Sequence, residues 1–288
     1  MNIGTLENTG VELLVAYDIF KSSTFSWNTS VNFSYSKRIT RPTFNDLAPF
    51  TYFVNPTTVI TGNPSLQPSI NNTIKADYVF RQYLFSLSIA KETNTITGFQ
   101  PESDSVKNLI VYSPQNLENT KTITGVFSVP VTVNSWWTMQ FNLTAIWQQV
   151  NAIYKKQDLR MAQASVNINA NQRFTLPKNY FFELTGFYQS AGLDGIVHRS
   201  DFGSLDVGLK KTLPGKWGSL SLNVANVFNS IKFDMDWDLP SQNLVGDFSL
   251  IPFRRNVKLT YSKNFGKDKL TAKRERATGA DDAKTREN

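Results

Sequence analysis

The chain of 288 residues contains no cysteine, a single histidine and no apolar run long enough for a membrane-spanning helix. The absence of cysteine excludes a disulfide scaffold and a thiolate metal site. A membrane helix needs about 20 consecutive apolar residues. Because no such run occurs, any crossing of a membrane has to be made by β-strands.

Charge is also sparse, since only 18% of the residues are Asp, Glu, Lys or Arg, although the formal net charge is +7. A positive net charge is typical of proteins that bind nucleic acid. Here the basic residues are scattered over loop positions and mixed with acidic ones in the stretch 267–288. We therefore predict no nucleic-acid partner and interpret 267–288 as a solvated polar tail.

The chain is rich in alternation of apolar and polar residues, which recurs in eleven stretches. In 137–147 every odd position is apolar, while Thr138, Gln140, Asn142 and Thr144 are polar and uncharged. A period of two indicates a β-strand with one apolar and one polar face. Each stretch is about as long as a tilted strand that crosses a bilayer, roughly 9–11 residues. The pattern predicts an all-β fold, a transmembrane antiparallel up-and-down β-barrel with a polar interior.

The breaks between these stretches alternate between very short and long. Outer-membrane barrels place short turns in the periplasm and long loops outside the cell. The predicted strands lie near 11–20, 24–36, 71–81, 83–96, 120–133, 135–147, 160–174, 178–189, 201–212, 217–229 and 254–265. The predicted extracellular loops lie near 38–69, 97–119, 148–158, 190–200 and 230–253. Residues 1–266 are thus expected to be barrel, and 267–288 a periplasmic tail.

An odd number of strands does not close a single-chain bacterial barrel, which has an even number. Eleven is half of the 22 strands of plugged outer-membrane transporters, so we predict that the chain supplies about half of such a barrel. The residues after Met1 lack the basic start and apolar core of an export signal. We therefore expect Met1 not to be the natural start of the protein.

Three residues conflict with the simplest form of this prediction. Lys91 and Lys263 fall on the lipid-facing parity, where a charge costs about 2–4 kcal/mol at the midplane but about 0–1 kcal/mol near an interface. Lys263 lies close to the predicted strand end, so its side chain is expected to reach the headgroups. Pro130 removes a ladder hydrogen bond and is predicted to mark a bulge or a strand end.

Three motifs lie between the second and third predicted strands: 35–42 (YSKRITRP), 46–50 (DLAPF) and 62–68 (GNPSLQP). Together with the terminal motif 261–266 (YSKNFG), they resemble the β-barrel of TonB-dependent outer-membrane receptors in the form typical of Bacteroidota. The resemblance begins near Val11 and covers the rest of the chain. One departure is Ala48, where the family usually carries Asn.

This resemblance implies ligand capture by extracellular loops, followed by displacement of a plug that is driven by TonB. TonB is expected to act only through a plug-bearing N-terminal region, which these residues do not encode. Outer-membrane lipid, the barrel-assembly machinery and a surface lipoprotein are the other partners that the resemblance implies.

The long segment 38–69 supplies the candidates for ligand binding, because Arg and aromatic residues are enriched at binding surfaces. The candidates are Arg38, Arg41, Phe44, Phe50, Tyr52 and Phe53. Two other interpretations stay open. Aromatic girdles at the membrane interface use the same residue types, and the prolines at 42, 49, 64 and 68 also serve to stiffen a surface loop.

The last predicted strand presents Val257, Leu259 and Tyr261 to lipid and is followed by Phe265. The resemblance implies that this strand is the signal that the barrel-assembly machinery recognises. Anchoring of Phe265 at the periplasmic interface is an alternative role.

Catalysis has little support in the sequence. His198 and its nearest acidic residues, Asp194 and Asp201, fall in a predicted loop with no nucleophile motif. Asp234, Asp236 and Asp238 alternate on one face, but a calcium site needs 6–8 oxygen ligands. We interpret these aspartates as a solvated strand extension. We predict no enzyme, no metal site and no cofactor.

Taken together, the residues and the resemblance predict the C-terminal barrel portion of a TonB-dependent receptor for nutrient uptake, located in the outer membrane. The nutrient is left open. Two alternatives are a passive outer-membrane channel and a secreted soluble carbohydrate-binding β-protein.

Overall fold

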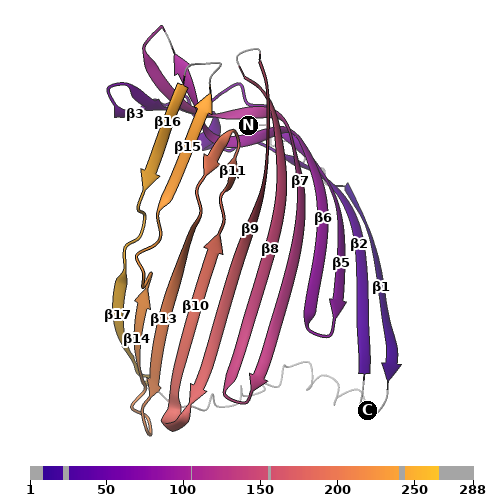
Figure 1. The fold of residues 1–288 in the computed structure, drawn as a ribbon, viewed down its shortest axis with the longest axis vertical. Coiled ribbons are helices and arrows are strands. Elements are labelled where there is room, and N and C mark those ends of the chain that lie inside the picture. The colour runs from indigo at the N-terminus through magenta and orange to yellow at the C-terminus, as the bar shows by residue number, and fades with distance from the viewer. Residues whose placement is uncertain (1–8, 22–25, 105, 155–156, 240–243, 266–288) are drawn as a thin grey trace, which may run out of the picture.

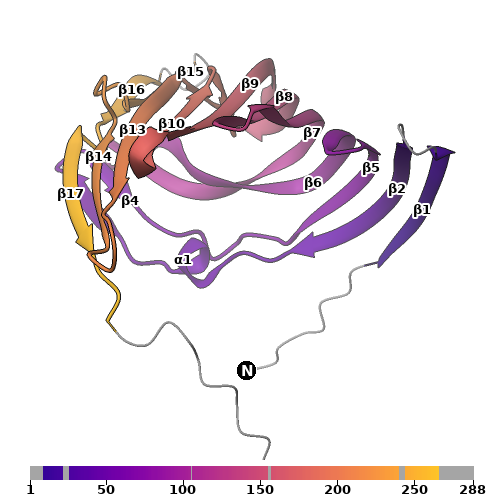
Figure 2. The same ribbon diagram turned by 90° about the horizontal axis from the view of Figure 1, so that it is seen from below.

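The computed structural model describes residues 9–21, 26–104, 106–154, 157–239 and 244–265. Eleven antiparallel strands follow one another in a single curved sheet that is open in the described part of the chain (Figures 1 and 2). In order along the sheet they are β1 (Thr9–Lys21), β2 (Ser26–Thr40), β5 (Ser69–Phe80), β6 (Tyr83–Asp104), β7 (Leu109–Asn134), β8 (Trp137–Tyr154), β9 (Gln157–Leu176), β10 (Tyr180–Gln189), β13 (Phe202–Thr212), β14 (Ser219–Ala225) and β17 (Asn256–Ser262). The predicted all-β, up-and-down antiparallel architecture is confirmed.

The register keeps apolar residues in line from strand to strand. One row, taken across β1, β2, β5, β6, β7, β8 and β9, is Leu13, Phe33, Ala76, Leu87, Gly125, Ala145 and Val166. Directly opposite residues in an antiparallel pair point to the same face. Phe33 and Leu87 are 53% and 42% exposed, so this face carries large apolar side chains without a protein cover.

The opposite face of the sheet is polar and internally hydrogen-bonded. The Ser128 hydroxyl donates to Asn142 Oδ1 at 2.7 Å, and Asn171 Nδ2 donates to the Thr185 hydroxyl at 3.0 Å. Because the curvature of the sheet encloses one side (Figure 2), this pattern fits a polar inner face and an apolar outer face.

Aromatic rings mark the end of the sheet that carries the short turns. Trp136, Trp137, Phe174 and Phe182 form a chain of ring contacts with centroids 5.5–6.2 Å apart. Trp147 lies ten residues further along β8. At about 3.4 Å per residue and a strand tilt of about 40°, this separation spans roughly 25 Å of height, the thickness of the apolar band of outer-membrane barrels.

Several segments predicted as loops contain ordered strands. β6 and β7 continue through most of 97–119 as a long hairpin, and β8 and β9 continue likewise through most of 148–158. The first hairpin turns near Asn108, which has a positive φ of 53°. The strand ends predicted there are wrong, because the strand pairing does not stop where the apolar band ends. That these segments lie outside the cell stays a prediction.

The other long connections contain short elements. Segment 38–69 holds α1 (Phe44–Leu47), β3 (Tyr52–Asn55) and β4 (Thr58–Ile60). Segments 190–200 and 230–253 hold β11 (Gly192–Asp194), β12 (Val197–Arg199), β15 (Phe233–Leu239) and β16 (Leu244–Leu250), which form a separate four-stranded sheet. A 3-10 turn, η1 (Pro177–Asn179), joins β9 to β10. Neither helix is long or apolar enough to span a membrane. The predicted tail 267–288 lies outside the described residues.

Pro130 does not mark a bulge or a strand end. It lies within β7 and pairs in register with Gln140 of β8. The pairing of β7 with β6 stops at Ser128, so β7 has a strand on one side only at this point. The missing N–H of Pro130 therefore removes no hydrogen bond to β6. Its carbonyl accepts a hydrogen bond from Gln82 Nε2 at 3.0 Å.

Candidate functional site

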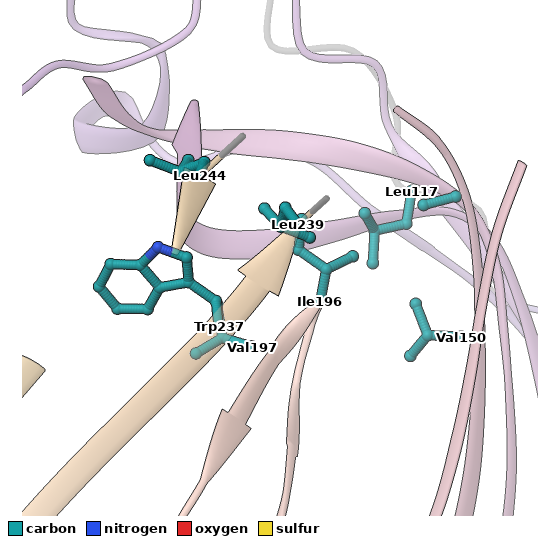
Figure 3. Packing of buried hydrophobic residues seen from close by; sticks show 8 residues of the cluster. Leu117, Val150, Ile196, Val197, Trp237, Leu239 and Leu244 are labelled. Carbon is teal, nitrogen blue, oxygen red and sulfur yellow. The ribbon is translucent and has the colours of Figure 1, made fainter. Parts of the chain in front are cut away.

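The main hydrophobic core lies at the long-loop end of the sheet, not between the barrel strands (Figure 3). Its buried members are Leu117, Val150, Ala152, Ile196, Val197, Trp237, Leu239 and Leu244. Trp237 is only 4% exposed, and its ring meets that of Tyr112 edge-on at 5.7 Å. The four-stranded sheet is thus a folded layer, called here the loop layer, that packs against extensions of β7 and β8.

The alternation in β15 explains how the loop layer forms. Trp237 and Leu239 are buried, whereas Asp236 and Asp238 on the other face are exposed. Asp234 pairs with Lys232 at 2.7 Å, and the Lys232 hydrogen bond holds the pKa of the Asp234 carboxyl below its usual value. The three aspartates therefore form the solvent face of an amphipathic strand.

A buried glutamine connects the loop layer to β6. Gln100 is 2% exposed, and its Oε1 accepts a hydrogen bond from the backbone N–H of Ile196 at 2.9 Å. Between β11 and β12, Gly195 has a φ of +62°, and a Cβ added there would lie 2.5 Å from Gln100 Oε1. The turn therefore needs glycine for both its backbone conformation and its close approach to β6.

A cavity of about 310 Å³ lies between the polar face of β8 and β9 and the loop layer. Its polar lining is Gln148, Gln163, Ser165, Gln189, Asp194 and Arg199. Gln148 pairs with Gln163 across the two strands, so both amides face the same space. Such a lining offers hydrogen-bond donors and acceptors to a polar ligand.

Arg199 is the most distinctive residue of this cavity. Its Nη2 donates to the Ser190 carbonyl at 3.2 Å, and its guanidinium lies 5.5 Å from the centre of the Phe202 ring. Its Nη1 is buried and makes no hydrogen bond within the described structure. Burial lowers the pKa of Arg199 and the charge of Asp194 opposes this, but an arginine stays protonated in either case. Arg199 therefore brings a cationic side chain to the lining of the cavity, while its Nη1 has no acceptor within the described structure.

The six loop residues predicted as ligand contacts lie on β2, α1, β3 and the connections between these elements. Arg38 lies in β2 opposite Asn71, and Arg41 follows that strand. Tyr52 and Phe53 are adjacent in β3, so their side chains point to opposite faces. Phe44 and Phe50 are about three-quarters exposed, at 76% and 75%. Their role in ligand binding stays a prediction.

Segment 38–69 is held by a helix cap and by hydrogen bonds of its backbone. Thr43 caps α1 through a reciprocal capping box with Asp46. The N–H of Ala48 donates to Phe44 and its carbonyl accepts from Gly62 at 3.0 Å. Both backbone groups of Ala48 are therefore used, and the fold of this segment does not depend on an Asn side chain there.

Two of the residues weighed for catalysis make separate hydrogen bonds in the structure. His198 Nδ1 lies 3.1 Å from Gln163 Oε1, whereas Asp201 accepts a hydrogen bond from the Tyr188 hydroxyl at 3.2 Å. Among the described residues, no group of three or more His, Cys, Asp or Glu side chains is placed to hold a metal ion.

The terminal strand β17 carries an exposed apolar row. Val257, Leu259 and Tyr261 pair in register with Val224, Leu222 and Leu220 of β14. Lys263 lies beyond the end of β17, with its ammonium group 5.0 Å from the Trp217 ring and 5.2 Å from the Phe265 ring. These contacts place Lys263 and the 86% exposed Phe265 at the end of the sheet that carries the short turns. Recognition of this strand by the assembly machinery stays a prediction.

A comparison with protein families identifies this architecture. A model of the outer membrane protein beta-barrel family matches residues 19–261, from β1 to β17 and well over half of the chain. No curated protein matches the sequence. The match agrees with the apolar outer face, the polar inner face and the aromatic boundary described above. The chain therefore belongs to the outer membrane protein beta-barrel family and is located in the outer membrane.

Proposed function

We propose that this chain forms part of the barrel wall of a TonB-dependent receptor that imports a nutrient across the outer membrane. The observation that carries the proposal is the open path of eleven strands, in which β1 and β17 each pair with one neighbour only among the described residues. An unpaired strand edge in hydrocarbon costs several kcal/mol for each unsatisfied backbone group. Further strands must therefore close the barrel, and eleven is half the number in plugged transporters.

The loop layer supplies the place where a nutrient would first be held. The cavity beneath it combines the cationic side chain of Arg199 with the amides of Gln148 and Gln163. This combination suits a ligand that carries a carboxylate or phosphate beside further polar groups. The proposed role is transport without catalysis, with TonB acting through a separate plug region and with a surface lipoprotein as an accessory partner.

Replacing Arg199 by Gln in the full-length protein is expected to lower uptake at limiting nutrient about tenfold or more. The reason is that a hydrogen bond to a charged group contributes about 1.5–3 kcal/mol. A nutrient that depends on the protein is first identified by comparing growth of a deletion strain with its parent on single nutrients. Arg254→Gln, at an exposed position outside the cavity, is the matched control. Equal uptake by the two variants would remove Arg199 from the ligand site.

A passive outer-membrane channel is the second candidate, because the polar inner face of the sheet also suits a water-filled pore. The soluble carbohydrate-binding alternative is wrong, because the chain belongs to an outer-membrane family.

Conductance distinguishes the two membrane functions. A planar bilayer that contains a plugged receptor is expected to show no steady conductance of small ions. A passive channel of similar size conducts steadily. The measurement uses the purified full-length protein, with a known porin as the positive control. Steady open conductance of the folded protein would refute the receptor proposal.

A further inference from the structure

Two neighbouring rows on the outer face of the sheet differ sharply in chemistry. The row nearer the short turns is Tyr35, Ile74, Ile89, Ile123, Trp147 and Ala164, on β2, β5, β6, β7, β8 and β9. The next row toward the long loops is Lys37, Asn72, Lys91, Lys121, Gln149 and Ala162, on the same strands. A single register step thus separates an uncharged, largely apolar row from one that carries three lysines and no acidic residue.

Hydrogen bonds confirm that the second row belongs to the outer face. The Tyr35 hydroxyl, from the apolar row, donates to Asn72 Oδ1 at 3.0 Å. Arg160 Nη2 donates to Gln149 Oε1 at 2.9 Å. The guanidinium of Arg160 therefore lies at the level of the lysines. We call Lys37, Lys91, Lys121 and Arg160 the cationic row.

The lysines of the cationic row lack acidic partners. Lys37, Lys91 and Lys121 are exposed, and none takes part in an ion pair seen between described residues. On the inner face, by contrast, Lys75 pairs with Asp77 at 2.9 Å. Lys91 and Lys121 stand directly opposite each other, and like charges in that position destabilise a sheet. An anion bound between them removes this repulsion.

The position of the cationic row indicates which kind of anion could bind between Lys91 and Lys121. On β6, β7 and β8 the apolar row below it ends the band that faces hydrocarbon, because the next row beyond the lysines is Thr93, Asn119 and Asn151 on these strands. Lys91 and Lys121 therefore lie at headgroup depth on the side of the long loops. Adjacent strands are about 4.7–4.9 Å apart, which lets Lys91 and Lys121 contact one phosphate together. We propose that the cationic row binds the phosphate groups of lipid headgroups in the outer leaflet. This site does not depend on whether the protein is a receptor or a channel.

The test measures binding of lipid A to the full-length protein, purified in detergent, by native mass spectrometry. The variant K37Q/K91Q/K121Q is compared with K107Q/K232Q/K258Q, which removes the same charge from positions outside the row. The first variant is expected to bind lipid A about 100-fold more weakly, from about fivefold for each lysine near an anionic surface. The control variant is expected to bind like the native protein.

Two further probes identify the source of the phosphate. Lipid A stripped of its phosphates is expected to bind weakly to both variants and to the native protein. Inorganic phosphate in excess is expected to leave lipid A bound. Equal binding of lipid A by the two triple variants, no effect of dephosphorylation, or displacement by inorganic phosphate alone would each overturn the proposal.

Two single variants at Lys121 keep the proposal testable if the triple variant does not fold. Lys121→Gln alone is expected to weaken lipid A binding about fivefold, and Lys121→Arg is expected to preserve it. Folding of each variant is checked by the heat-dependent mobility shift of the barrel on gels. Equal affinities of folded Lys121→Gln and Lys121→Arg would contradict a role for the charge.

Discussion

Replacing Leu143 by Arg in the full-length protein is expected to reduce the folded barrel in the outer membrane by about 30-fold or more. Leu143 lies on the outer face near the middle of β8, in register with Phe127 and Ile168. A charge at the bilayer midplane costs about 2–4 kcal/mol on this face. The measurement is the amount of heat-modifiable barrel in outer-membrane fractions.

The matched control is Asn142→Arg at the neighbouring position. Asn142 faces the polar interior, where it accepts hydrogen bonds from Ser128 and Gln140. An arginine there stays in contact with water, so the amount of folded barrel is expected to change little. If the two substitutions reduce the folded barrel equally, the assignment of the outer and inner faces is wrong.

Replacing Trp237 by Ala is expected to unfold the loop layer while leaving the barrel intact. Deleting a buried Trp or Phe side chain costs about 3–5 kcal/mol. Trp237 packs in a core that is made largely of loop-layer residues and two barrel extensions, so the loss should be local. The measurement is trypsin cleavage on intact cells near the exposed Lys232, with barrel folding followed by gel mobility.

Asp238→Ala is the control for this experiment, because Asp238 lies on the exposed face of the same strand. It is expected to keep native resistance to trypsin. Native resistance of Trp237→Ala would contradict a core at this position, and loss of the barrel together with the loops would contradict its independence.

The strands of the sheet are predictable from sequence because each strand faces two different solvents. Because one side faces lipid and the other faces water, apolar and polar residues alternate with a period of two. This alternation can be recognised in any short stretch of a strand, as in β8. The predicted 160–174 lies inside the longer β9, and the predicted 135–147 overlaps β8, which begins at Trp137 and continues to Tyr154. What fails is the position of the strand ends, because backbone pairing continues past the membrane without any change of local pattern.

The loop layer was not predictable by the same argument. The alternation in Phe233–Leu239 is visible in the sequence, but from the sequence its aspartates indicate only a solvated strand extension. Its buried face packs on Leu117 and Val150, which are far away along the chain. Arg199 had no local pattern at all, since its significance comes from a cavity between β12 and the paired strands β8 and β9.

The cationic row was also not predictable from the sequence alone. In the sequence, Lys91 is a single exception on a lipid-facing parity. Only the register places Lys91 beside Lys121 and two strands from Lys37, one step beyond the apolar band. An apparent conflict in one strand thus becomes a continuous feature of the sheet.

The orientation of the sheet in the outer membrane is tested most directly by the accessibility of single cysteines, because the chain has none of its own. Cysteines at Ser65 and at the 93% exposed Val106 lie in long connections, and one at Lys216 lies in a short turn. In the full-length protein on intact cells, a membrane-impermeant thiol reagent is expected to label the first two and to spare Lys216→Cys until the outer membrane is breached. Labelling of Lys216→Cys with protection of Ser65→Cys and Val106→Cys would contradict the assigned orientation.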